Sequence, residues 1–137
     1  MSAVQKARKR ALDLLYASDL TKTPLEEVFQ AEAQRALTDT ARASSWQYAA
    51  QIVRGVIDHQ QLIDEKIETV SLDWPLHRMP VVDRNILRLA SWELLYREDL
   101  DAAIVINEAI LLAKDYSTDD SARFVNAILA KIARIKQ

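Results

Sequence analysis

Glycine and proline are rare in this chain, which has one glycine and three prolines among 137 residues. Sheets joined by tight turns need such residues at many positions, and no stretch alternates apolar and polar residues between turn pairs. Apolar residues instead recur at intervals of three and four, which is the period of a helix that packs on one side. The sequence therefore predicts an all-α protein.

Three expected helices follow one another in the C-terminal half, over residues 83–97, 104–114 and 117–135. The middle one, Ile104–Lys114, is apolar nearly all round, and only Asn107 and Glu108 interrupt it. A helix of this kind must be surrounded by others, so we expect the rest of the chain to pack against it. Its two polar side chains should then satisfy buried hydrogen-bonding groups.

Two of these helices have candidate starts. Asp83 is a candidate N-cap for the first of them. Ser117 and Asp120 have the spacing of a capping box, in which the Asp120 carboxylate accepts from the Ser117 N–H. The last helix then places a set of apolar residues on one face: Phe124, Val125, Ile128, Leu129 and Ile132.

The N-terminal half predicts three further helices and two breaks. The helices cover Ala3–Leu20, a segment that starts at Thr23-Pro24, and Trp46–Val70, and the breaks are a polar connection at Asp39–Ser45 and Leu72–Pro80. Gly55 lies inside the longest helix, where glycine costs about 1 kcal/mol relative to alanine. This position predicts that another helix crosses there too closely for a side chain.

The composition describes one globular domain over residues 1–137, with 50% hydrophobic residues and a net charge of −2. No cysteine is present, which excludes disulfides and thiolate chemistry. No apolar run has membrane-spanning length and the start lacks a signal-peptide core, so we expect a cytoplasmic protein without a membrane contact. His59 and His77 lie in separate segments and no phosphate-binding glycine loop occurs, so we expect no enzyme, metal site or cofactor.

The only dense basic cluster lies in the first helix, at Lys6, Arg8, Lys9 and Arg10. Lys6, Lys9 and Arg10 project opposite the apolar face, whereas Arg8 projects on the apolar side and must extend past the edge of the core. Taken alone, such a cluster is more often the solvated face of a surface helix than a phosphate-binding site.

A set of residues along most of the chain resembles the family of the bacterial transcription antitermination protein NusB. They are Leu15-Tyr16, Val82-Asp83-Arg84, Ile86–Ala90, Glu93–Leu95, Asn107-Glu108-Ala109, Leu112–Lys114, Asp120-Ser121 and Phe124-Val125-Asn126. The resemblance implies about seven helices in two small bundles packed across each other. It also implies a protein that binds RNA without altering it, together with the ribosomal protein NusE. The pair would recognise a single-stranded boxA element in nascent ribosomal RNA and help RNA polymerase to read through terminators.

The resemblance also assigns roles to particular residues. Those expected at the RNA are Lys6, Arg8, Lys9, Arg10, Tyr16, Asp120, Arg123 and Phe124, with Asp83 and Arg84 expected to bind NusE. Tyr16 and Phe124 are the candidate stacking rings, although Phe124 also begins an apolar stripe that suits a core. Asp120, one turn before Phe124, would repel the RNA backbone. A helical protein-binding adaptor without RNA contact is the alternative, and a homodimer could cover the surface near Phe124.

Overall fold

The computed structural model describes residues 1–72 and 74–136, and within them every regular element is helical. The helices are α1 (Ala3–Thr21), α2 (Leu25–Ala36), α3 (Ala43–Ser71), α4 (Val81–Tyr96), α5 (Ala102–Tyr116) and α6 (Asp119–Ile135), with short 3₁₀ turns η1 (Thr40–Arg42) and η2 (Leu76–Arg78). The all-α prediction is confirmed. Six helices and two 3₁₀ turns stand close to the expected seven.

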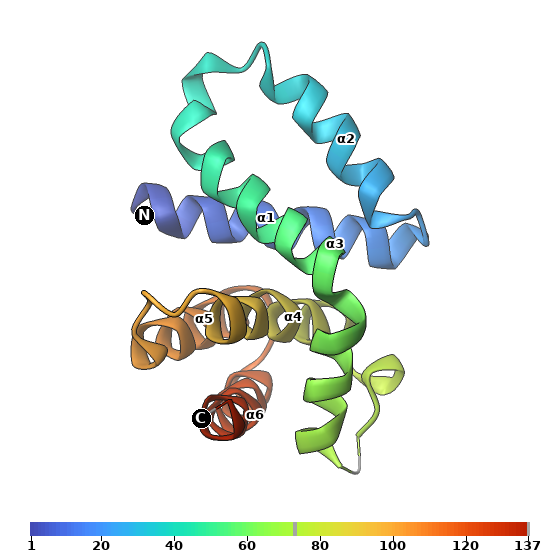
Figure 1. Ribbon diagram of the computed structural model, residues 1–137, viewed down its shortest axis with the longest axis vertical. Helices are drawn as coiled ribbons and strands as arrows, with labels where there is room; N and C mark the ends of the chain where they lie inside the picture. Colours follow the sequence, from blue (N-terminus) through green and yellow to red (C-terminus); the bar gives the residue numbers. More distant parts are fainter. Residues whose placement is uncertain (73, 137) are drawn as a thin grey trace.

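The helices form two small bundles that share α3 (Figure 1). One bundle combines α1, α2 and the first part of α3, and the other combines α4, α5 and α6 with the second part of α3. His59 has non-helical backbone angles (φ −128°, ψ 15°), so α3 bends where it passes from one bundle to the other. The prediction of two bundles packed across each other is confirmed.

The central helix of the structure is α4, and the prediction that residues 104–114 form the centre was wrong. α4 has ten buried residues and packs against α1, α3, α5 and α6, whereas α5 has four buried residues. Ile104 on α5 is 57% exposed, and Asn107 is exposed instead of bonding to buried groups. An apolar sequence all round a helix does not say which sides find partners, and α5 lies at the edge of the bundle.

Gly55 is the point at which α3 and α4 approach most tightly, as its position in the sequence predicted. A Cβ atom built on Gly55 would lie 2.0 Å from Nε1 of Trp92, a buried residue of α4. No real Cβ atom makes such a contact, so the only glycine in the chain is required by this crossing.

Both predicted caps in the C-terminal half were wrong by a few residues. α4 follows Pro80, so Asp83 lies in its first turn, where its buried carboxylate accepts hydrogen bonds from the hydroxyls of Ser117 (2.7 Å) and Ser121 (2.6 Å). The N-cap of α6 is Thr118, whose side chain accepts from the Ser121 N–H at 2.9 Å. The Ser117 hydroxyl, one residue before this cap, instead donates to Asp83.

Candidate nucleic-acid interface

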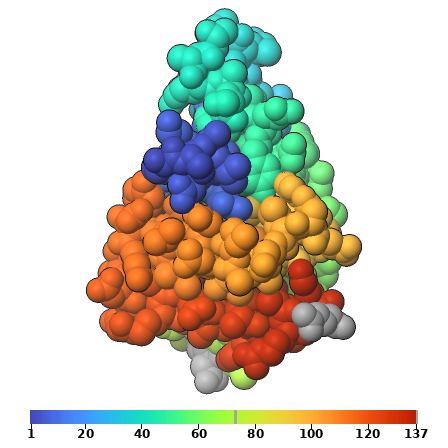
Figure 2. Space-filling model, turned by 90° about the vertical axis from the view of Figure 1, so that its left-hand side faces the viewer, coloured from blue at the N-terminus to red at the C-terminus, as the bar shows by residue number. Residues whose placement is uncertain are grey.

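A groove of about 380 Å³ lies where α1 meets η1 and the end of α5. Its lining comprises Met1, Lys6, Lys9, Arg10, Asp13, Ala41, Arg42, Ser44, Ser45 and Tyr116. Figure 2 shows this face, with the start of α1 in dark blue between the α2–α3 connection above it and α5 and α6 below it. The groove brings three of the predicted basic residues together and adds a fourth cation, Arg42.

Three of the cations in the groove have charge that faces outward. Lys6 is exposed, and the Nζ of Lys9 donates to Asp13 at 2.6 Å on the helix surface. Arg42 is 56% exposed along its side chain, and its Nε donates to Asp39 at 2.8 Å. Exposed pairs of this type are worth little, so a phosphate can compete for these cations.

Arg8 does not lie in this groove, and its buried environment contradicts the expectation that its charge reaches past the core. Its side chain is 6% exposed and pairs with Glu93 of α4, which is 1% exposed, with the Arg8 Nη2 at 3.0 Å from the carboxylate. Burial acts against the charged form of Arg8, but the hydrogen bond and the charge of Glu93 outweigh it and raise the pKa of Arg8. A phosphate in solvent cannot reach this guanidinium.

Tyr48 completes the buried group around Glu93. Its hydroxyl donates to the Glu93 carboxylate, and Arg97 lies over its ring at 5.2 Å from the centroid. Burial, followed by the negative charge of Glu93, raises the pKa of the Tyr48 hydroxyl. Arg8, Tyr48 and Glu93 come from α1, α3 and α4, so this group fastens the two bundles together.

Arg10 has a structural role beside the groove. Its guanidinium pairs with Glu32 at 3.2 Å, donates to the Arg42 carbonyl at 3.1 Å and lies 5.0 Å from the centroid of the Trp46 ring. These contacts hold η1 and the start of α3 against α1. Arg10 therefore shapes the wall of the groove, and most of its donors already have partners.

The candidate residues on α6 lie apart from the groove. Arg123 lines a separate hollow of about 420 Å³ between α5 and α6, and it pairs with Asp120 on the surface. Phe124 is partly buried and packs against Trp74, with the ring centroids 5.3 Å apart. Tyr16 is partly buried on α1. The linings of the groove and of the α5–α6 hollow include neither Tyr16 nor Phe124.

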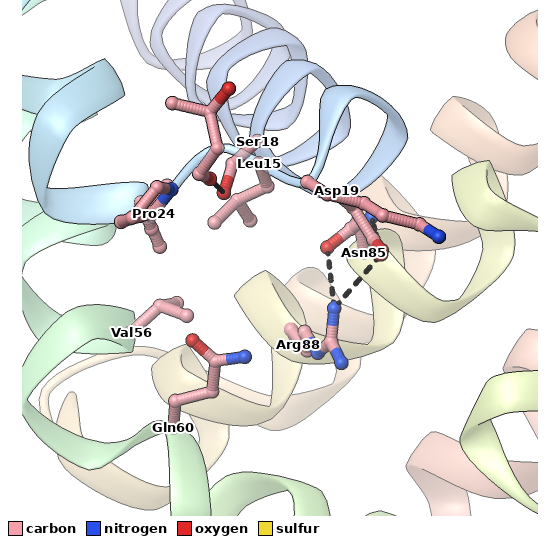
Figure 3. A pocket seen from close by; sticks show the side chains of 11 residues that line it. Leu15, Ser18, Asp19, Pro24, Val56, Gln60, Asn85 and Arg88 are labelled. Carbon is pink, nitrogen blue, oxygen red and sulfur yellow. Dashed lines mark hydrogen bonds and ion pairs between the residues drawn. The ribbon is translucent and has the colours of Figure 1, made fainter.

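A further hollow of about 410 Å³ marks the junction of the two bundles at the other end of α1. Figure 3 shows Asp19 and Asn85 directed toward Arg88, with Val56 and Gln60 on α3 across the hollow. The Arg88 Nη1 donates to Asp19 at 3.1 Å and to Asn85 at 3.0 Å. These polar groups satisfy one another, so the hollow is a junction between helices with few donors left for a ligand.

Arg84, one of the two residues expected to bind NusE, belongs to this junction. Its Nε and Nη2 each donate to the Asp19 carboxylate at 2.6 Å, a two-point pair between α4 and the end of α1. Burial alone would raise the pKa of Asp19, but hydrogen bonds from Arg84 and Asn85 and the two guanidinium charges outweigh it and lower the pKa.

The lowered pKa of Asp19 predicts a loss of stability in acid. A carboxylate whose pKa is lower in the folded state stabilises the fold above its unfolded pKa of about 3.9, and this contribution disappears as the pH falls through the folded pKa. The Asp19→Asn variant should therefore be less stable at pH 7 and should lose less stability than the wild type below about pH 4. Urea unfolding across this range tests the prediction, and identical pH profiles for both proteins would contradict it.

The cation of Arg42 and the aromatic ring of Tyr116 were not predicted from the sequence as parts of the site. Arg42 lies in the stretch interpreted as a connection, although a basic residue in such a stretch is a signal that could have been followed. Tyr116 ends the apolar helix α5, and nothing near it in the sequence indicates that it faces α1. The fold brings it under the ammonium of Lys9, which is 4.7 Å from its ring centroid.

Within residues 1–72 and 74–136, no group of three or more histidine, cysteine or acidic side chains could hold a metal ion. In the same residues no helix is long and apolar enough to cross a membrane. The described structure is an all-α protein with a surface groove that gathers four cationic side chains. Clusters of basic residues on one face are typical of proteins that bind nucleic acids.

Comparison with known proteins identifies the family of this chain. The NusB family model matches residues 5–134. The transcription antitermination protein NusB of Leifsonia xyli subsp. xyli is 53% identical over 136 residues, which cover 99% of this chain and 94% of that protein. The chain belongs to the NusB family, and the resemblance found in the sequence is confirmed.

Solved structures agree with this assignment. NusB of T. maritima superposes with a TM-score of 0.82 at 31% identity, covering 98% of this chain and 92% of the other. The crystal structure of antitermination factors NusB and NusE in complex with dsRNA gives a TM-score of 0.82 at 27% identity, covering 98% of both chains. That relative assembles with NusE and RNA.

Proposed function

We propose that this chain is an RNA-binding transcription antitermination factor, a binding protein and not an enzyme, which acts with NusE. In this proposal the pair recognises a boxA element in nascent ribosomal RNA and helps the RNA polymerase antitermination complex to read through terminators. The observation that carries the proposal is the basic groove of Lys6, Lys9 and Arg42 in a chain of the NusB family. The relative that is complexed with NusE and double-stranded RNA supports both partners.

We propose single-stranded RNA as the ligand. Because the related complex contains double-stranded RNA, the test must also include a duplex. A titration of boxA-type RNA, a scrambled RNA of equal length and a duplex of the same sequence, each with and without NusE, tests the proposal. We expect the tightest binding for single-stranded boxA RNA in the presence of NusE. Equal affinity for boxA and scrambled RNA would contradict the proposed recognition of the boxA sequence. An absence of RNA binding with NusE present would leave only the helical adaptor.

Asp83 and Arg84 support the proposed NusE interface indirectly. The Asp83 carboxylate is buried under the hydroxyls of Ser117 and Ser121, and Arg84 is engaged by Asp19. Neither side chain is free to pair with a partner in this arrangement. Direct binding of NusE by these two residues stays a prediction. In the present arrangement we propose that they act by setting the positions of α6 and α1 for the partner.

Asp120 gives a prediction that separates charge from stability. It lies exposed in the first turn of α6 and pairs with Arg123, while Thr118 makes the cap. The Asp120→Asn variant should therefore unfold at nearly the wild-type temperature. If the RNA backbone passes within a Debye length of α6, about 10 Å, removing this negative charge and releasing Arg123 should raise RNA affinity about twofold at low salt.

The Asp120 effect is a screened Coulomb effect, so the gain should vanish as salt is raised. Asp99→Asn is the matched control, because Asp99 is also exposed and paired with a neighbouring arginine, Arg97, but lies beyond the end of α4. Thermal melting and RNA titration at several salt concentrations give both quantities. An Asp120→Asn protein that binds RNA no better than Asp99→Asn would place Asp120 away from the RNA.

A further inference from the structure

We propose that the groove between α1, η1 and the end of α5 is a subsite for one unpaired nucleotide of single-stranded RNA. Tyr116 stacks on the base, and Lys6 and Arg42 bind the phosphates on either side of it. The subsite rests on the proposed function and deepens it, because it assigns one nucleotide of the bound RNA to particular residues.

The ring of Tyr116 provides the stacking surface. Tyr116 is the last residue of α5, lines the groove and is 43% exposed, so part of its side chain is open to solvent. The Lys9 ammonium lies 4.7 Å from the ring centroid and so covers one face of the ring. We place the base against the exposed part of the ring, and such stacking accepts any base because every base has a π-face.

Arg42 of η1 supplies a further cation to the groove. The Arg10 guanidinium donates to the Arg42 carbonyl at 3.1 Å, which ties η1 to α1 and sets the width of the groove. The Arg42 side chain is 56% exposed and uses Nε for Asp39. Its two terminal amino groups have no hydrogen-bond partner within residues 1–72 and 74–136, so they remain available to a phosphate.

The charge and size of the groove suit a nucleotide. Its lining carries four cations, Lys6, Lys9, Arg10 and Arg42, and one carboxylate, that of Asp13. The carboxylates of Glu32 and Asp39, which pair with Arg10 and Arg42, lie outside the lining. Asp13 is neutralised by Lys9 at 2.6 Å. The volume of about 380 Å³ falls in the range of roughly 300–1,000 Å³ that is usual for small-molecule sites.

Only an unpaired base fits this arrangement. In a double helix both faces of a base are covered by its neighbours, whereas bases of single strands and loops can be splayed onto aromatic side chains. The subsite therefore predicts that the contribution of Tyr116 is large for single-stranded RNA and small for a duplex, while that of Arg42 is similar for both.

The test uses the full chain with NusE and single-stranded boxA-type RNAs that carry the fluorescent base 2-aminopurine at successive positions. Stacking quenches this base, so one position should lose fluorescence on binding to the wild type and to Tyr116→Phe. Tyr116→Leu should abolish the quenching at that position and weaken binding about 5-fold to 100-fold. Affinity falls as salt rises, and in Arg42→Ala this dependence should be weaker: the slope of log affinity against log salt should be less negative by about 0.7. Arg134→Ala, an exposed arginine on α6, should change neither quantity.

The outcomes separate this inference from the proposed function. If the wild type binds RNA, but Tyr116→Leu keeps the quenching and the affinity, the nucleotide subsite is wrong and the RNA-binding function stands. An equal loss for duplex and single-stranded RNA in Tyr116→Leu would show a structural role for the ring and would also overturn the subsite. If the wild type binds no RNA with NusE, both proposals fail.

Discussion

Replacing Arg8 by alanine should cost about 3–5 kcal/mol of the free energy of unfolding and lower the melting temperature by about 10–20 °C. The reason is the carboxylate that would remain. Glu93 is 1% exposed, so removing Arg8 leaves a buried charge with only Tyr48 as a partner. The Arg8→Ala variant should also bind RNA weakly, but only because it is partly unfolded.

A double-mutant cycle tests this origin of the stability. Arg8→Met removes the charge and keeps much of the side-chain volume, and Glu93→Gln keeps an acceptor for Tyr48 while removing the negative charge. The double variant should lose less stability than the sum of the single variants, with a coupling of about 0.5–3 kcal/mol. Additive losses would contradict a stabilising pair between Arg8 and Glu93. An Arg8→Ala protein that is as stable as the wild type but binds RNA poorly would show that Arg8 is an exposed phosphate ligand.

Gly55→Ala should destabilise the fold by about 2–3 kcal/mol, although alanine is the better helix former by about 1 kcal/mol. The new methyl group would overlap the Trp92 indole, with the Cβ 2.0 Å from Nε1, and α3 and α4 would have to move apart. Chemical unfolding of the purified variant measures the loss.

The control for Gly55 is the same substitution in a Trp92→Leu protein. Trp92→Leu destabilises the core by itself, but it removes the indole that a Cβ atom would meet. In that background Gly55→Ala should change sign and stabilise by about 0.5–1 kcal/mol, which is the ordinary helix-propensity gain. A stabilising effect of Gly55→Ala in the wild type would contradict the close crossing of α3 and α4.

The helices and the Gly55 crossing could be predicted because they depend on local patterns. Periodicity places apolar residues on one face of each helix, and an isolated glycine inside a helix indicates a close neighbour. The caps were less predictable, because Ser117 and Thr118 both suit an N-cap. In the structure Thr118 makes the cap, while the Ser117 hydroxyl donates to Asp83, which is distant in the sequence.

The pairing of Arg8 could not be predicted from the sequence, because its partner Glu93 lies 85 positions further along the chain. The same reason explains why Tyr116 and Arg42 were not predicted as residues of the groove. Tyr116 and Arg42 meet α1 only after the chain has folded, and one of them stands in an unremarkable connection. Local sequence marks the basic cluster on α1, but tertiary packing decides that Arg8 turns inward while Lys6 and Lys9 remain at the surface.

The salt dependence of RNA binding is the measurement that tests the central claim, that the groove binds the RNA backbone. Affinity for single-stranded boxA RNA is measured with NusE at several salt concentrations for the wild type, Lys6→Ala, Arg42→Ala and the control Lys131→Ala, an exposed lysine on α6. Each of the first two substitutions should make the slope of log affinity against log salt less negative by about 0.7, and the control should leave the slope unchanged. Equal slopes for all four proteins would contradict the assignment of this groove to RNA.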